Sequence, residues 1–321
     1  MPKLYLAPME GVLDFTLREL LTHQVGIDQC VTEFIRVSDR LLPRSVFLRL
    51  APELNQGGCT RSGVPVFLQL LGSDPSLLAE NAAKAAELGA PGIDLNFGCP
   101  AKTVNKSRGG AVLLKEPDLI HDIVCAVRKA VPMNTPVTAK MRLGFADKSL
   151  AIENAQSIET AGASSLTIHA RTKLEGYKPP AHWEWIAKIR DAVDMHLIAN
   201  GEVWTQQDYW RCKILSGCED VMLGRGMLSN PFLAETLVTQ QNQSIEVSWI
   251  RLLPLLERYS KQVITDLSER HVHGRIKQWL NMLRWHYPQA ESLFTQIRTE
   301  KDPRVILQKI QSAQHETPAI P

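Results

Sequence analysis

Residues 64–98 read VPVFLQLLGSDPSLLAENAAKAAELGAPGIDLNFG, and this stretch decides the fold. Its two ends, VPVFLQLLG and GIDLNFG, are short apolar runs typical of buried β-strands. Between them, LLAENAAKAAELGA repeats apolar residues with helical periodicity and stops near Gly89, which predicts a helix. A strand, a helix and a second strand in succession favour a parallel sheet.

The same alternation recurs along most of the chain. Eight apolar runs, each followed by glycine, proline or polar residues, are LYLAPM (4–9), CVTEFI (30–35), VPVFLQLLG (64–72), GIDLNFG (92–98), PVTAKMRLG (136–144), SSLTIHAR (164–171), MHLIANG (195–201) and DVMLGRG (220–226). Their ends are about 31 residues apart on average, the size of one βαβ unit. Eight such units predict an α/β fold of the (β/α)8 TIM-barrel type, with an open doubly wound sheet as the alternative.

The strand pattern stops after about residue 235. The remainder predicts three or four amphipathic helices, so we expect a catalytic barrel over residues 1–240 and a helical domain over residues 243–321, joined by a polar linker at 239–244. The formal net charge is only +2, but residues 243–321 hold 11 Lys+Arg and 8 Asp+Glu, a net of +3. The basic surplus therefore lies in the predicted helical domain.

Composition narrows the class of protein. Hydrophobic residues at 44% and charged residues at 22% are ordinary for a soluble globular chain, and neither a signal peptide nor a long apolar span is visible. The six cysteines form no CxxC pair and show no metal-ligand spacing, which predicts reduced thiols and no metal. We expect a cytoplasmic protein that acts as a monomer without a membrane partner.

Polar residues end the last two predicted strands. Asn200 and Gly201 end the seventh, and Gly224 and Arg225 end the eighth, where barrels of this type often bind phosphate through backbone N–H groups. The alternative is that these glycines only make tight turns. Two such sites on the two expected strands favour a phosphate site.

A second set of polar residues lies on predicted strands that are otherwise apolar. Lys140 and Arg142 are two positions apart and therefore share one face of their strand, and Gln69 and His169 lie on other strands. Each alone is compatible with a satisfied core group, but together they indicate a lined pocket. With a phosphate site at its edge, this pocket suits flavin mononucleotide (FMN), and Lys140 could stabilise negative charge on the reduced ring.

Cys99 follows the fourth predicted strand, between Gly98 and Pro100. A thiol with a pKa of about 8.5 is mostly protonated at neutral pH, so Cys99 is suited to donate a proton. Nucleophilic catalysis is the competing role, but no cysteine–histidine pair is recognisable from spacing. Asn96 nearby carries an amide that can recognise a base edge.

The stretches APMEGVLD, LNFGCPAKTVNKSRGGAVLL, TAKMRLG, TIHARTKLEGY, IANGEV and MLGRG, in this order, resemble signatures of the tRNA-dihydrouridine synthases across nearly the whole chain. The resemblance implies an FMN barrel that NADPH reduces, and a helical domain for tRNA. It implies that Cys99 is the proton donor, that Asn96 and Arg171 contact the target nucleotide, and that the flavin is held by Pro8, Met9, Glu10, Gln69, Lys140, His169, Asn200, Gly201, Glu202, Gly224 and Arg225. The expected reaction passes hydride to carbon 6 of a flipped-out uracil while Cys99 protonates carbon 5.

The segment RHVHGRIKQWLNMLRW (270–285) supports an RNA partner. On a helix, Ile276, Trp279, Leu280 and Leu283 share an apolar face, and a basic face adjoins it. RIKQW and TEFIRV most resemble the C-type branch of the family, which acts on uridine 16 of the D-loop, with positions 17, 20 and 20a as alternatives. The basic residues predicted to meet RNA are Arg36, Arg275, Lys277 and Arg284.

Two other functions fit parts of the pattern. One is a small-molecule pyrimidine reductase on a similar flavin barrel, whose substrate would not need the helical domain. The other is a non-enzymatic RNA-binding or RNA-chaperone protein that keeps the barrel as a scaffold. The polar pocket with Cys99, Lys140 and His169 argues against a pure binder, which has no evident use for it.

Overall fold

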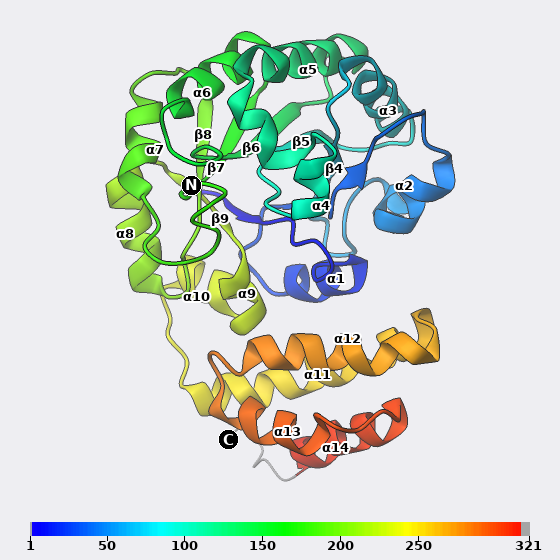
Figure 1. Ribbon diagram of the computed structural model, residues 1–321. Helices are drawn as coiled ribbons and strands as arrows, with labels where there is room; N and C mark the ends of the chain where they lie inside the picture. Colours follow the sequence, from blue (N-terminus) through cyan, green and yellow to red (C-terminus); the bar gives the residue numbers. More distant parts are fainter. Residues whose placement is uncertain (1, 316–321) are drawn as a thin grey trace. The chain divides into compact units, whose positions relative to one another are not determined.

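The computed structural model describes residues 2–315, and its centre is a closed barrel of parallel strands (Figure 1). The strands are β1 (Leu4–Leu6), β2 (Gln29–Val31), β3 (Ile35–Arg36), β4 (Val66–Leu71), β5 (Ile93–Phe97), β6 (Val137–Arg142), β7 (Ser165–His169), β8 (His196–Asn200) and β9 (Asp220–Leu223). They are hydrogen-bonded in the order β2-β1-β9-β8-β7-β6-β5-β4-β3, and a further β2–β4 pairing closes the ring. The predicted TIM barrel is confirmed.

The second predicted strand is split in two. β2 and β3 are separate short strands that both pair with β4, Cys30 opposite Val66 and Ile35 opposite Leu70. Together they fill one position in the barrel, so the nine observed strands correspond to the eight predicted runs.

Helices surround the barrel (Figure 1). They are α2 (Arg44–Leu50), α3 (Pro75–Glu87), α4 (Lys102–Lys106), α5 (Pro117–Ala130), α6 (Ala151–Thr160), α7 (Trp183–Arg190) and α8 (Gln206–Ser216), with short 3-10 helices η1 (Pro52–Gln56) and η2 (Gly110–Lys115). The helix predicted from residues 77–90 is α3. The Asp74 carboxylate accepts from the Leu77 N–H at its start, and Gly89 follows its end with a φ of 91°.

Alternate strand residues point into the barrel, and their character changes along its axis. One level is apolar and is formed by Tyr5, Ala7, Val31, Phe67, Ile198 and Met222. Nearer the carboxyl ends of the strands the buried residues become polar, as Gln69, Asn96 and Asn200 show. The apolar level therefore lies beneath a layer of polar side chains, here called the chamber.

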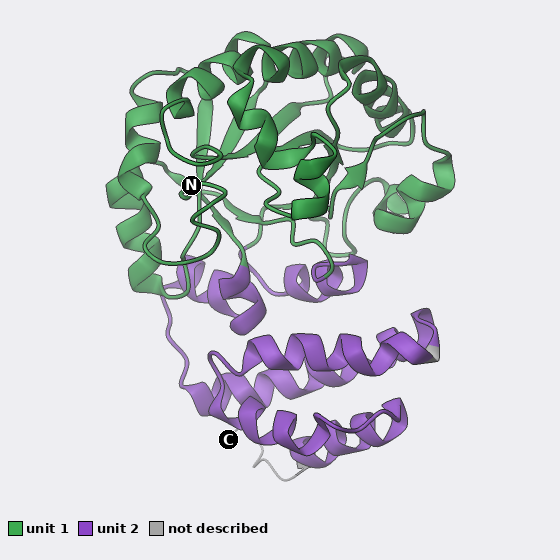
Figure 2. Ribbon diagram, in the orientation of Figure 1, with its two compact units in different colours: residues 1–11, 27–224 green, residues 12–26, 225–321 purple. Residues whose placement is uncertain are grey.

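The chain divides into two compact units, residues 1–11 with 27–224 and residues 12–26 with 225–321 (Figure 2). The second unit holds α1 (Phe15–His23), α9 (Arg225–Ser229), α10 (Leu233–Thr239), α11 (Ile245–Asp266), α12 (Glu269–Leu283), α13 (Pro288–Ile297) and α14 (Pro303–His315). This division differs from the boundary expected at residues 240–243, because α1 packs against α11 and Gly26 lies so near α10 that a Cβ there would be 2.7 Å from the Ala234 carbonyl oxygen. Residues 316–321 of the predicted helical domain lie outside the described residues.

The second unit is held by an aromatic and apolar core. Ile276, Trp279, Leu280 and Leu283 of α12 are all buried, as the helical pattern predicted. The Trp279 and Tyr259 rings pack edge-on with their centroids 4.8 Å apart, and Trp279 Nε1 donates to the Leu228 carbonyl at 3.2 Å. Within residues 2–315, no helix has the length and apolar character required to cross a membrane.

One ion pair links α12 to the start of α1. Arg275 donates to Asp14 from Nη2 at 2.6 Å and from Nε at 3.1 Å, and Nη2 also donates to the Val12 carbonyl at 2.9 Å. Asp14 also accepts from the Leu17 N–H at the start of α1. The pair is mostly buried, with side-chain exposures of 15% and 29%.

We expect a coupling energy of about 1.5 to 3 kcal/mol between Asp14 and Arg275, because hydrogen bonds to charged groups are worth that much. A double-mutant cycle of Asp14→Asn and Arg275→Ala, with unfolding followed by denaturant titration, measures it. Asparagine retains the helix cap, so the cycle isolates the ion pair. Additive effects of the two substitutions would contradict this role for Arg275.

Candidate functional site

Polar side chains from neighbouring strands meet at the carboxyl end of the barrel. The register sets Asn96 opposite Lys140, Arg142 opposite His169, and His169 opposite Asn200. All five side chains come from β5, β6, β7 and β8, and this is the end where TIM barrels carry their active sites. The residues that the sequence placed on separate strands therefore line one chamber.

A buried carboxylate, Asp94, organises one wall of the chamber. It accepts from Gln69 Nε2 at 2.7 Å and from the Thr138 hydroxyl at 2.6 Å, and Gln69 Oε1 accepts from Asn96 Nδ2 at 2.8 Å. Burial raises the pKa of Asp94, although these two donors and Lys140 act against it. Sequence reasoning missed Asp94, although an acidic residue inside the apolar run GIDLNFG was a usable signal.

Lys140 lies on the neighbouring strand. Its Nζ donates to Asn200 Oδ1 at 2.9 Å, and Asn200 Nδ2 donates to the Met222 carbonyl at 2.8 Å. Burial and the nearby Arg142 lower the pKa of Lys140 to about 8, although Asp94 favours its charged form. Among the described residues, the side-chain acceptor bonded to the ammonium is the neutral Asn200 amide, so an anion beside the ammonium would be favoured.

Cys99 sits in a turn that Asn96 shapes. Asn96 Oδ1 accepts from the N–H groups of Gly98 and Cys99 at 2.9 and 2.8 Å. Burial raises the pKa of the half-buried Cys99 thiol, and the charge of Glu10 adds to this. The backbone N–H of Ala101 and the positive charges of Arg142 and Arg36 lower the same pKa. The thiol stays protonated at neutral pH, as a proton donor must.

Gly110 packs directly against this turn. Its φ is 67°, and a Cβ placed there would lie 2.8 Å from the Cys99 carbonyl oxygen and 2.9 Å from its Cβ. The Cys99 carbonyl also accepts from Asn105 Nδ2 at 2.8 Å and from the Ala111 N–H at 3.1 Å. The turn that carries the thiol is therefore held from behind by several contacts.

Arg142 is buried beside the same turn, with 2% exposure. Its Nε donates to the Gly98 carbonyl at 2.9 Å, and its Nη1 donates to the Thr172 and Gly176 carbonyls at 3.0 and 2.8 Å. The Tyr177 ring lies 5.1 Å from the guanidinium. The sequence placed Arg142 on the pocket face of its strand without showing that it links two loops.

The ends of β8 and β9 carry the expected phosphate residues. Gly201 has a φ of 117°, and a Cβ there would lie 2.7 Å from the His169 ring, so only glycine fits. A Cβ at Gly224 would lie 3.8 Å from the Ala7 Cβ and 4.0 Å from the Met9 sulfur, at ordinary van der Waals distance, so the packing there does not by itself require glycine. Arg225 is the first residue of α9.

Arg171 and Glu202 form an ion pair at the same end of the barrel. Glu202 also accepts from Trp204 Nε1 at 3.1 Å and has a φ of 59°, which is unusual for a residue other than glycine. Arg171 is fully buried, and among the described residues its Nη1 has no hydrogen-bond partner. A buried guanidinium with an unused donor is a fitting neighbour for an anionic or carbonyl group.

The first loop brings three predicted residues to the rim. Pro8 and Met9 are half-buried, and Glu10 is largely exposed. Partial burial and the neighbouring Glu33 nevertheless raise the pKa of Glu10 to about 7, although a backbone N–H at Phe34 acts against them. Glu33 itself accepts from the Gly11 N–H at 2.6 Å.

The four basic residues predicted to meet RNA all have partners within their own unit. Arg36 is exposed and donates to Ser107, and Arg275 is paired with Asp14. Lys277 donates to the Arg298 and Glu300 carbonyls, and Arg284 is paired with Glu291 and lies 4.5 Å from the Phe294 ring. Helix positions reveal a basic face but not these partners, so RNA contact by these residues stays a prediction.

Comparison with known proteins decides the family. A family model described as dihydrouridine synthase (Dus) matches residues 5–316. The chain belongs to the dihydrouridine synthase family. A Pseudomonas putida protein, 58% identical over 299 residues, covers 92% of this chain and 93% of its own length, and a Ralstonia nicotianae protein is 52% identical over 98% of this chain and 96% of its own. Both are named tRNA-dihydrouridine(16) synthase. The family predicted from the sequence motifs is confirmed, and with it the prediction of an enzyme.

Solved structures show the same barrel. The old yellow enzyme homologue of Zymomonas mobilis superposes with a TM-score of 0.52, covering 75% of this dihydrouridine synthase and 90% of that chain. Because the two sequences are only 12% identical, this similarity concerns the fold alone.

The raised pKa of Glu10 predicts a pH-dependent stability difference. Its carboxyl ionises near pH 7 in the folded chain and near 4.5 when unfolded, so between these values the folded state binds more protons and stability falls as pH rises. Glu10→Gln should therefore gain stability relative to the wild type as pH rises from 4.5 to 7. Thermal unfolding of both proteins across this range tests it, and a constant difference would contradict the shift.

Gly110→Ala should destabilise the fold by about 1 to 3 kcal/mol, because alanine disfavours a positive φ. It should also change the rate at which iodoacetamide alkylates Cys99, because the new methyl group displaces the turn. Gly63→Ala is the matched control, since Gly63 has a φ of 85° and no atom within 4 Å of the added Cβ. Equal alkylation rates in the two variants would show that Gly110 does not position the thiol.

Proposed function

We propose that this chain reduces uridine in transfer RNA to 5,6-dihydrouridine at position 16 of the D-loop, with bound FMN and with NADPH as reductant. The relatives named for this reaction and position are 46% to 58% identical over 92% to 98% of the chain. Similarity at this level over the full length supports the same substrate and the C-type branch. The proposed place of action is the cytoplasm.

The observation that carries the proposal is that a protonated thiol, Cys99, and a cation without a paired carboxylate, Lys140, lie at the same end of the barrel. Burial raises the pKa of Cys99, whereas burial and Arg142 lower the pKa of Lys140. An acid is needed at carbon 5 of the uracil, and a positive charge is needed where an anionic reduced cofactor lies. A pocket that only bound RNA would require neither.

The residues at the chamber fit FMN. Gly224 has no side chain to cover its backbone N–H, and Arg225, the next residue, would add positive charge for a phosphate. Asn200, Gly201 and Glu202 complete the proposed phosphate end, while Pro8, Met9, Glu10, Gln69, Lys140 and His169 would hold the ring system. FMN, once reduced by NADPH, supplies the hydride that uracil accepts at carbon 6.

This chain's residues provide the remaining chemistry. Cys99 would transfer its thiol proton to carbon 5 of the uracil, and the resulting thiolate is stabilised by Arg142 and Arg36. Asn96 holds the Cys99 turn, and Asn96 and Arg171 are proposed to contact the target nucleotide. The uridine must leave its stack to enter the chamber. The helical domain, with Arg275, Lys277 and Arg284, is proposed to bind the tRNA.

Cys99→Ala should bind flavin and tRNA normally but lose about 100-fold or more in turnover, the usual contribution of a general acid. The assay incubates the protein with NADPH and unmodified tRNA and maps dihydrouridine by nucleotide position. Cys125→Ala on α5, another half-buried cysteine, is the matched control and should keep full activity.

Dihydrouridine at position 16 in the wild type, and its loss in Cys99→Ala alone, would support the proposal. A single different position would keep the reaction and reject the branch. Reduction of a free pyrimidine but not of tRNA would replace the proposal with a small-molecule reductase. Full turnover in Cys99→Ala would reject the thiol as proton donor.

A further inference from the structure

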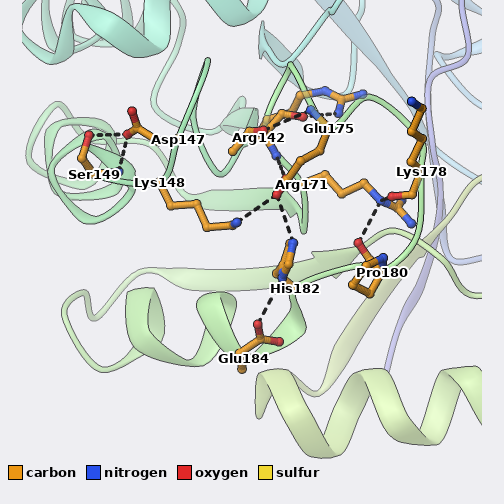
Figure 3. Close-up of polar contacts among 11 residues, drawn as sticks. Arg142, Asp147, Lys148, Ser149, Arg171, Glu175, Lys178, Pro180, His182 and Glu184 are labelled. Atoms are coloured by element: carbon orange, nitrogen blue, oxygen red, sulfur yellow. Dashed lines mark hydrogen bonds and ion pairs between the residues drawn. The ribbon is translucent and has the colours of Figure 1, made fainter.

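A polar loop follows β7, and Glu175 lies at its centre (Figure 3). One oxygen of Glu175 accepts from the Thr172 N–H at 2.6 Å. The other accepts from Lys148 Nζ at 2.9 Å and from His182 Nε2 at 3.1 Å. Glu175 therefore links Thr172 at the start of its loop to His182 at the end of it. Through Lys148 it also links this loop to the loop after β6.

The backbone of this loop turns its carbonyls toward two buried guanidinium groups. The carbonyls of Thr172 and Gly176 accept from Arg142, and the carbonyls of Lys178 and Pro180 accept from Arg171 at 2.7 and 3.2 Å. Arg142 and Arg171 are 2% and 0% exposed. Since a buried cation needs its acceptors, the conformation of the loop determines where both guanidinium groups lie.

Arg142 carries this constraint to the thiol. Its Nε donates to the carbonyl of Gly98, the residue next to Cys99, at 2.9 Å. No carboxylate within residues 2–315 is paired with Arg142, and its charge is held by three backbone carbonyls, two of them from the Glu175 loop, and by the Tyr177 side chain of the same loop. A shift of that loop would move Arg142 and leave Gly98 without its donor.

We propose that Glu175 is a positioning residue for the reaction, which acts through Arg142 to set the location and acidity of the Cys99 thiol. This inference rests on the proposed function only for its kinetic consequence. Its structural part concerns Cys99 alone and can be measured without tRNA or reductant.

Charge supports the same role. Burial acts to raise the pKa of Glu175, but the Thr172 N–H, Lys148 and His182 outweigh it and hold the pKa at about 2. Glu175 is therefore ionised throughout the pH range in which an enzyme works. Burial raises the pKa of Cys99 and the Ala101 N–H lowers it; among charged groups, Glu10 raises this pKa, and Arg142 and Arg36 lower it.

The test compares Glu175→Ala, Glu175→Gln and Glu175→Asp in the full-length protein. In Glu175→Ala the loop carbonyls of Thr172 and Gly176 are no longer held in place and Arg142 shifts away from the thiol. The pH midpoint for alkylation of Cys99 by iodoacetamide should therefore rise, as followed by mass spectrometry of its peptide. Turnover at saturating tRNA should fall between about 10-fold and 100-fold with little change in KM, because misplacement by about 1 Å can cost that much. Glu175→Asp should restore part of both, since it keeps the charge.

Glu184→Gln is the matched control. Glu184 also approaches His182, at 3.3 Å from Nδ1 (Figure 3), but its side chain is 54% exposed. Unlike Glu175, it does not accept from the Thr172 N–H. It should leave the alkylation midpoint and turnover unchanged. Thermal unfolding identifies variants that fail to fold, and Glu175→Gln then replaces Glu175→Ala in the comparison.

A folded Glu175 variant with a wild-type alkylation midpoint and wild-type turnover would overturn the inference, as would equal losses in Glu184→Gln. A shifted midpoint in a chain whose wild type makes no dihydrouridine would uphold the positioning of Cys99 while rejecting the proposed function. The two failures are therefore distinguishable.

Discussion

The buried guanidinium of Arg142 is the constraint on which the site depends. A charge with 2% exposure must be surrounded by acceptors, and the carbonyls of Gly98, Thr172 and Gly176 serve here together with the Tyr177 side chain. Because the first belongs to the turn that carries Cys99 and the other two to the loop after β7, one side chain ties two loops to the end of β6. Loops are ordinarily the mobile parts of a TIM barrel, and this bond network gives them a defined geometry.

The chamber holds three titratable groups whose protonation is set by different hydrogen bonds and charges. Asp94 is buried and Lys140 and Cys99 are half-buried, and burial shifts each toward its neutral form. Hydrogen bonds and neighbouring charges then act against that shift to different degrees. The carboxylate keeps two donors, the ammonium keeps one neutral acceptor, and the thiol keeps its proton. A chamber of this kind can hold an anion and deliver a proton at neutral pH.

In the second unit, the basic residues predicted to bind RNA also stabilise the fold. Arg275 closes the start of α1 against α12 through Asp14, and Lys277 satisfies the carbonyls that α13 leaves at its end. A phosphate that approached these residues would compete with partners they already have. Affinity for RNA would then depend on the free energy needed to break these pairs, so RNA binding and the local stability of this unit would be coupled.

The sequence by itself determined the order of strands and helices, the barrel, the amphipathic face of α12 and the family. These follow from periodicity and from short motifs, which are local along the chain. It also placed Gln69, Lys140 and His169 on strands and Cys99 just after one, because strands and their ends can be read from apolar runs and from where these stop. Their chemical roles remain predictions.

Only the tertiary structure decided which side chains are hydrogen-bond and packing partners. That Asp94 joins Gln69 to Thr138, that Gly110 lies behind Cys99, and that Glu175 reaches Arg142 through backbone carbonyls depends on contacts between residues distant in sequence. The same holds for α1, which precedes most of the barrel in the chain but packs with the C-terminal helices. A pattern shows which face of a strand or helix is polar, whereas the acceptor that faces it is set by packing in three dimensions.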